Sequence, residues 1–220
     1  IETGNERISA MASSRFGYHE NVIGKFSPGQ GINPSFWDGH AKLSIRANER
    51  HTIDLQGLIA SDDLTLTELD ADRFQSRYAT GHIWLNWKYV PSERTILTTT
   101  IHGSEGVAKR IGSVFAGGAL SGFVDDLRNT IDGGAKFDLQ SKKDHHRIRA
   151  GAEVKRQLTD FYYFKQLRAS AGSRHEIEDF QISTTGTEFG AFISDTWQPS
   201  PRVSTEIGLR YDAHSHTSDQ

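Results

Sequence analysis

The feature that most constrains this chain is a long alternation of apolar and polar residues close to its end. In the stretch RVSTEIGLRYDAHSH (residues 202–216), the mostly apolar positions are Val203, Thr205, Ile207, Leu209 and Tyr211. The intervening positions are polar, charged or glycine: Ser204, Glu206, Gly208, Arg210 and Asp212. Successive side chains of a β-strand point to opposite faces, so this period of two predicts a long strand with one apolar and one polar face.

The same pattern recurs in pairs of runs joined by short polar turns, which predicts a series of hairpins. The predicted turns lie near 48–50, 91–94, 141–145 and 199–202. Together with a first run at residues 5–17, the periodicity indicates about nine strands. Gly- and Asp-rich stretches between the hairpins predict long loops at the opposite end of the sheet, near 18–35, 62–75, 105–122 and 165–186. We therefore expect an all-β fold, an antiparallel up-and-down meander that forms one unit over residues 1–220.

The composition excludes several classes of protein. The net charge of -3, from 25 basic and 28 acidic residues, lacks the basic excess that nucleic-acid binding requires. The absence of cysteine excludes disulfides, thiolate metal sites and a cysteine nucleophile. The mean hydropathy is -0.55, and no apolar run of about 18 residues predicts a transmembrane helix. Strands of a membrane barrel alternate and therefore also score as hydrophilic.

Two settings fit such a sheet: a soluble core against its apolar face, or lipid against that face. Crossing the hydrocarbon layer takes ~9–11 tilted residues per strand, and most runs here have about nine to fifteen, whereas soluble strands average about 5–6. Trp87 and Tyr89 precede the PSER turn and Trp197 precedes PSPR, as expected for aromatic residues at a membrane interface. Burying charges such as Arg147 and Glu206 in a dry core would cost several kcal/mol each. The sequence therefore favours part of a large transmembrane β-barrel with a hydrated or plugged lumen.

One hairpin carries a family resemblance. The stretch GAFISDTWQPSPRVSTEIGLRYD (residues 190–212) resembles the late-barrel hairpin of TonB-dependent outer-membrane receptors, which often reads A-x-F-x-Q-D-x-W, a turn with Pro and Arg, then G-L-R-Y-D. The matching positions are Ala191, Phe192, Asp195, Trp197, Pro201, Arg202 and Gly208 to Asp212. Ser194 stands where the family commonly has Gln. The remainder of the chain resembles the family through its hairpin rhythm and long connections.

The resemblance implies a 22-stranded barrel in the outer membrane of a Gram-negative cell. It would import a scarce nutrient such as a ferric siderophore, with energy transmitted by the TonB complex through a plug domain. We recognise no plug, no TonB-contacting segment and no aromatic-ended final strand, so we expect this chain to be a middle piece. An odd number of about nine strands is not expected to close by itself, and open strand edges are not tolerated in lipid.

Other chemistry is weakly indicated. A metal site at His145-His146 or at His214 and His216 is conceivable, but solvated histidines are the favoured interpretation. The acidic run DDLTLTELDAD lacks calcium-loop spacing, and Asp62-Asp63 and Asp125-Asp126 point their neighbouring carboxylates to opposite faces. We find no catalytic constellation, expect no enzyme, and predict no cofactor and no metal.

Ligand contacts, if the receptor interpretation holds, are expected in the long loops and the upper lumen wall. The candidates are cationic or ring-bearing: Arg73, Tyr78, His102, Lys109, Arg110, Tyr163, Lys165 and Arg174. Cations suit a ferric siderophore or another anion, and rings suit a sugar or a corrin. Two alternatives stay open at this point: a passive porin-like barrel, and a soluble β-rich module that binds carbohydrate.

Overall fold

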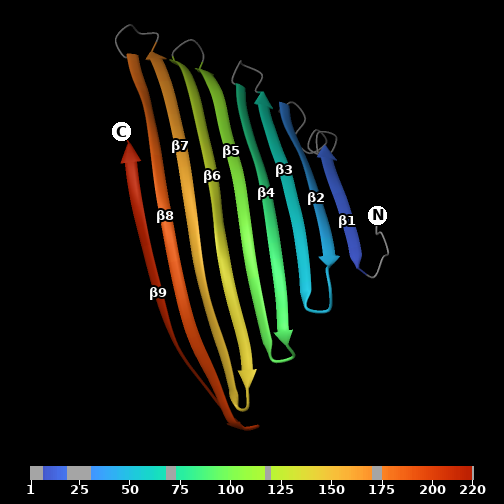
Figure 1. Ribbon diagram of the computed structural model, residues 1–220. Helices are drawn as coiled ribbons and strands as arrows, with labels where there is room; N and C mark the ends of the chain where they lie inside the picture. The colour runs from blue at the N-terminus through green and yellow to red at the C-terminus, as the bar shows by residue number, and fades with distance from the viewer. Residues whose placement is uncertain (1–6, 19–30, 68–72, 117–119, 170–174, 220) are drawn as a thin grey trace.

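The computed structural model describes residues 7–18, 31–67, 73–116, 120–169 and 175–219, and it arranges them as one curved sheet of antiparallel strands (Figure 1). Each strand pairs with its neighbours in sequence, in the order β1 to β9. The strands are β1 (Ile8–Tyr18), β2 (Gly31–Arg46), β3 (His51–Thr67), β4 (Arg73–Ser92), β5 (Thr95–Ala116), β6 (Leu120–Lys143), β7 (His146–Ala169), β8 (His175–Ser200) and β9 (Val203–Asp219). The predicted all-β, up-and-down meander is confirmed.

Four short turns join the strands at one end of the sheet, which is the lower end in Figure 1. In the β2–β3 turn, the Asn48 side-chain oxygen accepts hydrogen bonds from the backbone N–H groups of Arg50 and His51, at 2.9 and 3.0 Å. An Asx turn of this kind reverses the chain locally. In the β6–β7 turn, Asp144 has a φ of 51°, a left-handed conformation that Asp tolerates better than most residues. All four predicted turn positions are confirmed.

The strands are longer than the sequence pattern predicts at the upper end of the sheet. The predicted loop near 105–122 is mostly strand, because β5 continues to Ala116 and β6 begins at Leu120. The predicted loops near 62–75 and 165–186 are likewise largely strand, and part of 18–35 belongs to β1 and β2. Lys109-Arg110 and Asp125-Asp126 show the reason: both faces are polar here, so the alternation that marks a strand disappears although the backbone ladder continues.

In the lower part of the sheet, the register separates an apolar face from a polar face from one strand to the next. One row of directly opposite residues runs over β2 to β8 as Leu43, Leu55, Leu85, Ile101, Ala135, Val154 and Phe189. At the β9 edge, Ile207 and Leu209 of the same face are 74% and 78% exposed. We call this side the apolar face, and the side that carries Arg147, Glu206 and Arg210 the polar face.

The sheet is a single layer without a hydrophobic core. Among the described residues no hydrophobic side chain is buried, and the two buried polar ones are Ser61 and Asp126. The accessible surface is 15698 Å², whereas a compact protein of this mass exposes roughly 10,000 Å². A soluble binding module needs a buried core, so the described residues do not support that alternative.

No helix in the described part of the chain has the length and the apolar character needed to span a bilayer.

Candidate functional site

Aromatic rings gather on the apolar face close to the lower end of the sheet. The Trp87 indole N–H donates to His51 Nδ1 at 3.1 Å, and the His51 ring stacks on Tyr89 with centroids 4.4 Å apart. Beyond β5 and β6, Trp197 of β8 stacks on His146 of β7, whose Nδ1 lies 2.6 Å from an Asp195 carboxylate oxygen. The three predicted rings thus share one face and one end. Their role at a membrane interface stays a prediction.

A charged and aromatic cluster lies on the polar face in the upper half of β5 to β8. We call it the upper cluster; it consists of Arg110, Asp126, Arg128, Phe161, Tyr163 and Phe180. Arg110, Asp126, Tyr163 and Phe180 are direct cross-strand neighbours in one row. Arg128 and Phe161 are direct cross-strand partners as well, two positions from Asp126 and Tyr163 along their strands. Cross-strand neighbours on one face have Cβ atoms about 5 Å apart, so the register itself assembles the cluster.

In the upper cluster, the carboxylate of Asp126 forms ion pairs with two guanidinium groups. The Asp126 side chain is 2% exposed, and it accepts a hydrogen bond from Arg110 Nη2. Arg128 Nε lies 3.4 Å from the other Asp126 oxygen. The arginine side chains themselves are 50% and 53% exposed. Each guanidinium has five N–H donors, so the trio has a surplus positive charge and free donors that face the polar side.

Aromatic rings flank these cations. The Arg128 guanidinium carbon lies 4.7 Å from the centroid of the Phe161 ring, a cation–π arrangement. Phe180 packs edge-on against Phe161 at 5.5 Å and lies 5.2 Å from the Tyr163 ring. The cluster therefore offers hydrogen-bond donors, a positive charge and ring surfaces within a few neighbouring positions. This combination suits an anionic ligand that has flat or apolar parts.

The structure places five of the predicted ligand contacts on the polar face. Arg110 and Tyr163 belong to the upper cluster, and Tyr78 lies in the row of Arg128, separated from it by Ala108. Lys165 sits in the next row up, with its Nζ 3.2 Å from Glu176 and 3.2 Å from Glu178. His102 lies lower on the wall, with Nε2 3.9 Å from Asp132.

The other three predicted contacts are not brought into this group. Arg73 and Lys109 are in register with the apolar face, in its upper part, where Lys109 opposes Arg77. Arg174 lies outside the described residues. Their part in ligand binding stays a prediction.

Sequence reasoning missed Asp126, Arg128, Phe161 and Phe180. Their positions alternate in phase with Arg110 and Tyr163, but that becomes visible only once the pairing of β5 to β8 is known. Among the described residues, no group of three or more His, Asp or Glu side chains is arranged to hold a metal ion.

Comparison with known proteins agrees with this geometry. The family described as TonB dependent receptor-like, beta-barrel matches residues 5–220. No curated protein sequence matches the chain.

Three solved structures illustrate the shared fold. The ferric preacinetobactin receptor BauA from Acinetobacter baumannii is 11% identical with a TM-score of 0.64, over 99% of this chain and 43% of that one. The open form of the ferric-catecholate import receptor Fiu from E. coli K12 is 9% identical with a TM-score of 0.71, over 98% and 42%. The copper transporter OprC is 12% identical with a TM-score of 0.65, over 98% and 34%. The chain thus spans less than half the length of these proteins, and the likeness concerns the fold.

The TonB-dependent receptors are a family of transporters and receptors of the Gram-negative outer membrane, not a family of enzymes. The family match covers nearly the entire chain, and the open sheet reproduces part of such a barrel. The chain therefore belongs to the TonB-dependent receptor-like β-barrel family.

Proposed function

We propose that residues 1–220 form one continuous wall segment of a receptor barrel in the outer membrane of a Gram-negative cell. The apolar face would contact lipid, and the polar face would line the lumen. In the described residues β1 and β9 do not pair with each other. Unpaired strand edges are too costly in a bilayer, so further strands would complete the barrel.

The cargo that the upper cluster suits best is an anionic chelate, and a ferric siderophore is the leading candidate. The single observation that carries this proposal is the sharing of buried Asp126 by Arg110 and Arg128, which leaves donors and positive charge toward the lumen. The names of BauA and Fiu support a ferric cargo, while that of OprC shows that the same fold also serves copper. The proposed cargo therefore rests more on the chemistry of the upper cluster than on the similarity to these solved structures.

In this proposal the barrel binds cargo without making or breaking a covalent bond. Arg110 and Arg128 hold the anionic part through charge-assisted hydrogen bonds, and the rings of Phe161, Tyr163 and Phe180 contact its flat parts. Because these side chains stand on paired strands, the wall is ordered before the cargo arrives. Release inward would depend on the TonB complex, acting through a plug domain.

The test uses the complete receptor, purified from outer membranes and checked for a heat-dependent change of electrophoretic mobility. Binding of a ferric tris-catecholate is followed by quenching of tryptophan fluorescence. We expect Arg110→Gln to weaken binding about 10–100-fold, because hydrogen bonds to charged groups contribute about 1.5–3 kcal/mol. Lys88→Gln is the matched control, since it removes a cation from the same polar face at the lower end of β4, away from the upper cluster.

Equal losses in the two variants, with both barrels still heat-modifiable, would refute the assignment of the upper cluster as the cargo site. A wild-type receptor that binds Cu²⁺ or an oligopeptide but no ferric chelate would refute the siderophore proposal. Import that persists in cells without TonB would favour a passive barrel. A protein found in the soluble fraction would refute the membrane assignment itself.

A further inference from the structure

Two opposite charges interrupt the apolar face on β5 and β7. Glu105 is followed by Val107 on that face of β5, and Arg156 stands between Val154 and Leu158 on that face of β7. Both charged side chains are exposed. Among the described residues, no ion pair joins either of them to a group of opposite charge. In the proposed barrel both charges would face lipid, which is costly unless each has a partner.

The position of Glu105 along β5 places it within the apolar band of such a barrel. Glu105 stands eight residues (105 − 97) above Leu97, which opposes Tyr89 at the aromatic end. A rise of about 3.3 Å per residue gives about 26 Å along the strand, or about 20 Å across the membrane at a tilt of about 40°. The apolar band of a membrane barrel is about 25 Å tall, so Glu105 would lie in its upper part.

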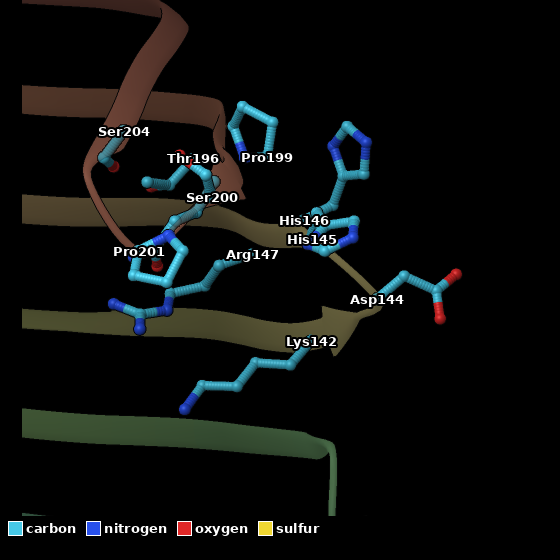
Figure 2. Close-up of a pocket in the computed structure, with 11 residues that line it drawn as sticks. Lys142, Asp144, His145, His146, Arg147, Thr196, Pro199, Ser200, Pro201 and Ser204 are labelled. Carbon is cyan, nitrogen blue, oxygen red and sulfur yellow. The ribbon is translucent and has the colours of Figure 1, made fainter.

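Glu105 and Arg156 lie at the same depth, one strand to either side of β6. The lower turns are staggered (Figure 1): Thr95 opposes Ser141 of β6, and β6 continues two residues further, to Lys143, before its own turn. Figure 2 shows this β6–β7 turn between the ends of its two strands. Tilted strands need such a stagger if their turns share one rim. Counted from that rim, Glu105 is ten residues (105 − 95) above the start of β5, and Arg156 is ten residues (156 − 146) above the start of β7.

Two copies of the chain can neutralise these charges for one another. Copies inserted in the same direction are related by a twofold axis along the membrane normal, and such a contact is self-complementary. With β6 on the axis, β5 of one copy faces β7 of the other. Each Glu105 then meets the Arg156 side chain of the second copy at equal depth. Gly103 and Gly133 are direct partners between these strands and present no side chain, so the second wall can approach closely.

Charge complementarity selects a second copy over other occupants of this face. A lipid chain or an apolar helix would leave both charges without a partner. Within one copy, the two residues stand two strands apart, which is about 12 Å at that tilt.

We propose that the receptor forms a twofold dimer through the lipid-facing side of β5, β6 and β7, held by two reciprocal ion pairs between Glu105 and Arg156. The inference rests on the proposed function, because it requires the apolar face to contact lipid. It names a partner for the outside of the wall, separate from the cargo in the lumen.

Cross-linking in intact outer membranes tests this contact in the complete receptor. Ile131 opposes Glu105 directly and stands two residues from the partner of Arg156, so it lies next to the proposed axis. Residues 1–220 contain no cysteine, and any cysteine elsewhere in the receptor is replaced by serine, so Ile131→Cys introduces a single thiol. Packed sheets lie about 10 Å apart, a gap that a short bismaleimide spans. We expect roughly tenfold more cross-linked dimer than from Ile59→Cys, the control on the same face of β3.

Charge exchange tests which groups make the contact. In the Ile131→Cys receptor, Glu105→Lys or Arg156→Glu alone should lower the dimer yield roughly tenfold, because like charges then meet across the interface. When the two variants are expressed together with different tags, they should cross-link to each other, because every pair across the axis is again of opposite charge. Lys155→Glu makes the same charge change as Arg156→Glu on the polar face of β7, and it should leave the yield unchanged.

Three results would overturn the inference: a dimer yield from Ile131→Cys no higher than from Ile59→Cys, a cross-linked product that contains another protein, or a yield that charge reversal at Glu105 and Arg156 leaves unchanged. Any of these results in a heat-modifiable barrel that binds ferric chelate would leave the proposed function intact. A protein that never reaches the outer membrane would refute both.

Discussion

Replacing Ile101 with arginine tests whether the apolar face contacts lipid. Ile101 lies in the central strand β5 and is 52% exposed in the sheet. Along β5 it stands four residues (101 − 97) from Leu97, which opposes Tyr89 at the aromatic end. A rise of about 3.3 Å per residue gives about 13 Å along the strand, or about 10 Å across the membrane at a tilt of about 40°. Half of an apolar band of about 25 Å is about 12 Å, so Ile101 would lie close to the midplane.

The expected cost of Ile101→Arg is therefore about 2–4 kcal/mol of unfolding free energy, the cost of an arginine near the middle of the bilayer. The control is Thr100→Arg on the adjacent, polar position. Thr100 donates a hydrogen bond to Asn86 at 2.8 Å, and losing it costs about 1 kcal/mol, while the new arginine stays hydrated.

The measurement is guanidinium titration of the complete receptor refolded into lipid vesicles, followed by tryptophan fluorescence. The informative quantity is the difference in unfolding free energy between the two variants, because both add the same side chain to the same strand. Equal losses of stability, or a larger loss for Thr100→Arg, would refute the assignment of the two faces.

Three further outcomes follow from particular contacts. Asp126→Asn should cost about 1.5–3 kcal/mol in the same titration, because two half-exposed guanidinium groups lose a charge-assisted hydrogen bond to their shared carboxylate; an unchanged unfolding midpoint would show that the trio is not coupled. Gly134→Ala should lower the folded yield, measured as the heat-modifiable fraction, because its Cβ would stand 2.6 Å from the Val154 carbonyl oxygen, whereas Gly57→Ala, with 3.7 Å to its nearest neighbour, should be tolerated. Trp87→Phe should cost about 1 kcal/mol through the lost hydrogen bond to His51, and an unchanged unfolding midpoint would contradict that contact.

The sequence predicts the lower half of the sheet better than the upper half. Where one face is apolar, as at Ile53 and Leu55, alternation marks each strand and polar turns such as the one at Asn48 mark its end. In the proposed barrel, water would contact both faces above that zone, which accounts for neighbours such as Lys109 and Arg110 that are both charged and for the loss of the period of two. Strand pairing continues there because backbone hydrogen bonds need no apolar face.

The sequence predicted which kinds of side chain form the candidate site, but not all of the residues that form it. Arg110 and Tyr163 could be chosen as a cation and a ring in the expected upper wall, but Asp126 looked like half of an adjacent acidic pair. The burial of Asp126 depends on cross-strand pairing with Arg110, which lies 16 residues away in the sequence. A register over four strands decides which side chains meet, and a shift by one residue would move each to the other face.

The alternation of the two faces has a consequence for how such receptors can diverge. Neighbouring residues such as Ile101 and His102 face opposite sides of the sheet. In the proposed barrel, substitutions that alter what the lumen binds therefore need not alter the contact between the barrel and its membrane. Selection can therefore act on odd and even positions of one strand separately. The fold is shared with a ferric preacinetobactin receptor at 11% identity and with a copper transporter at 12%. Such low identity is expected when the residues on one face of a strand can change without constraint from those on the other.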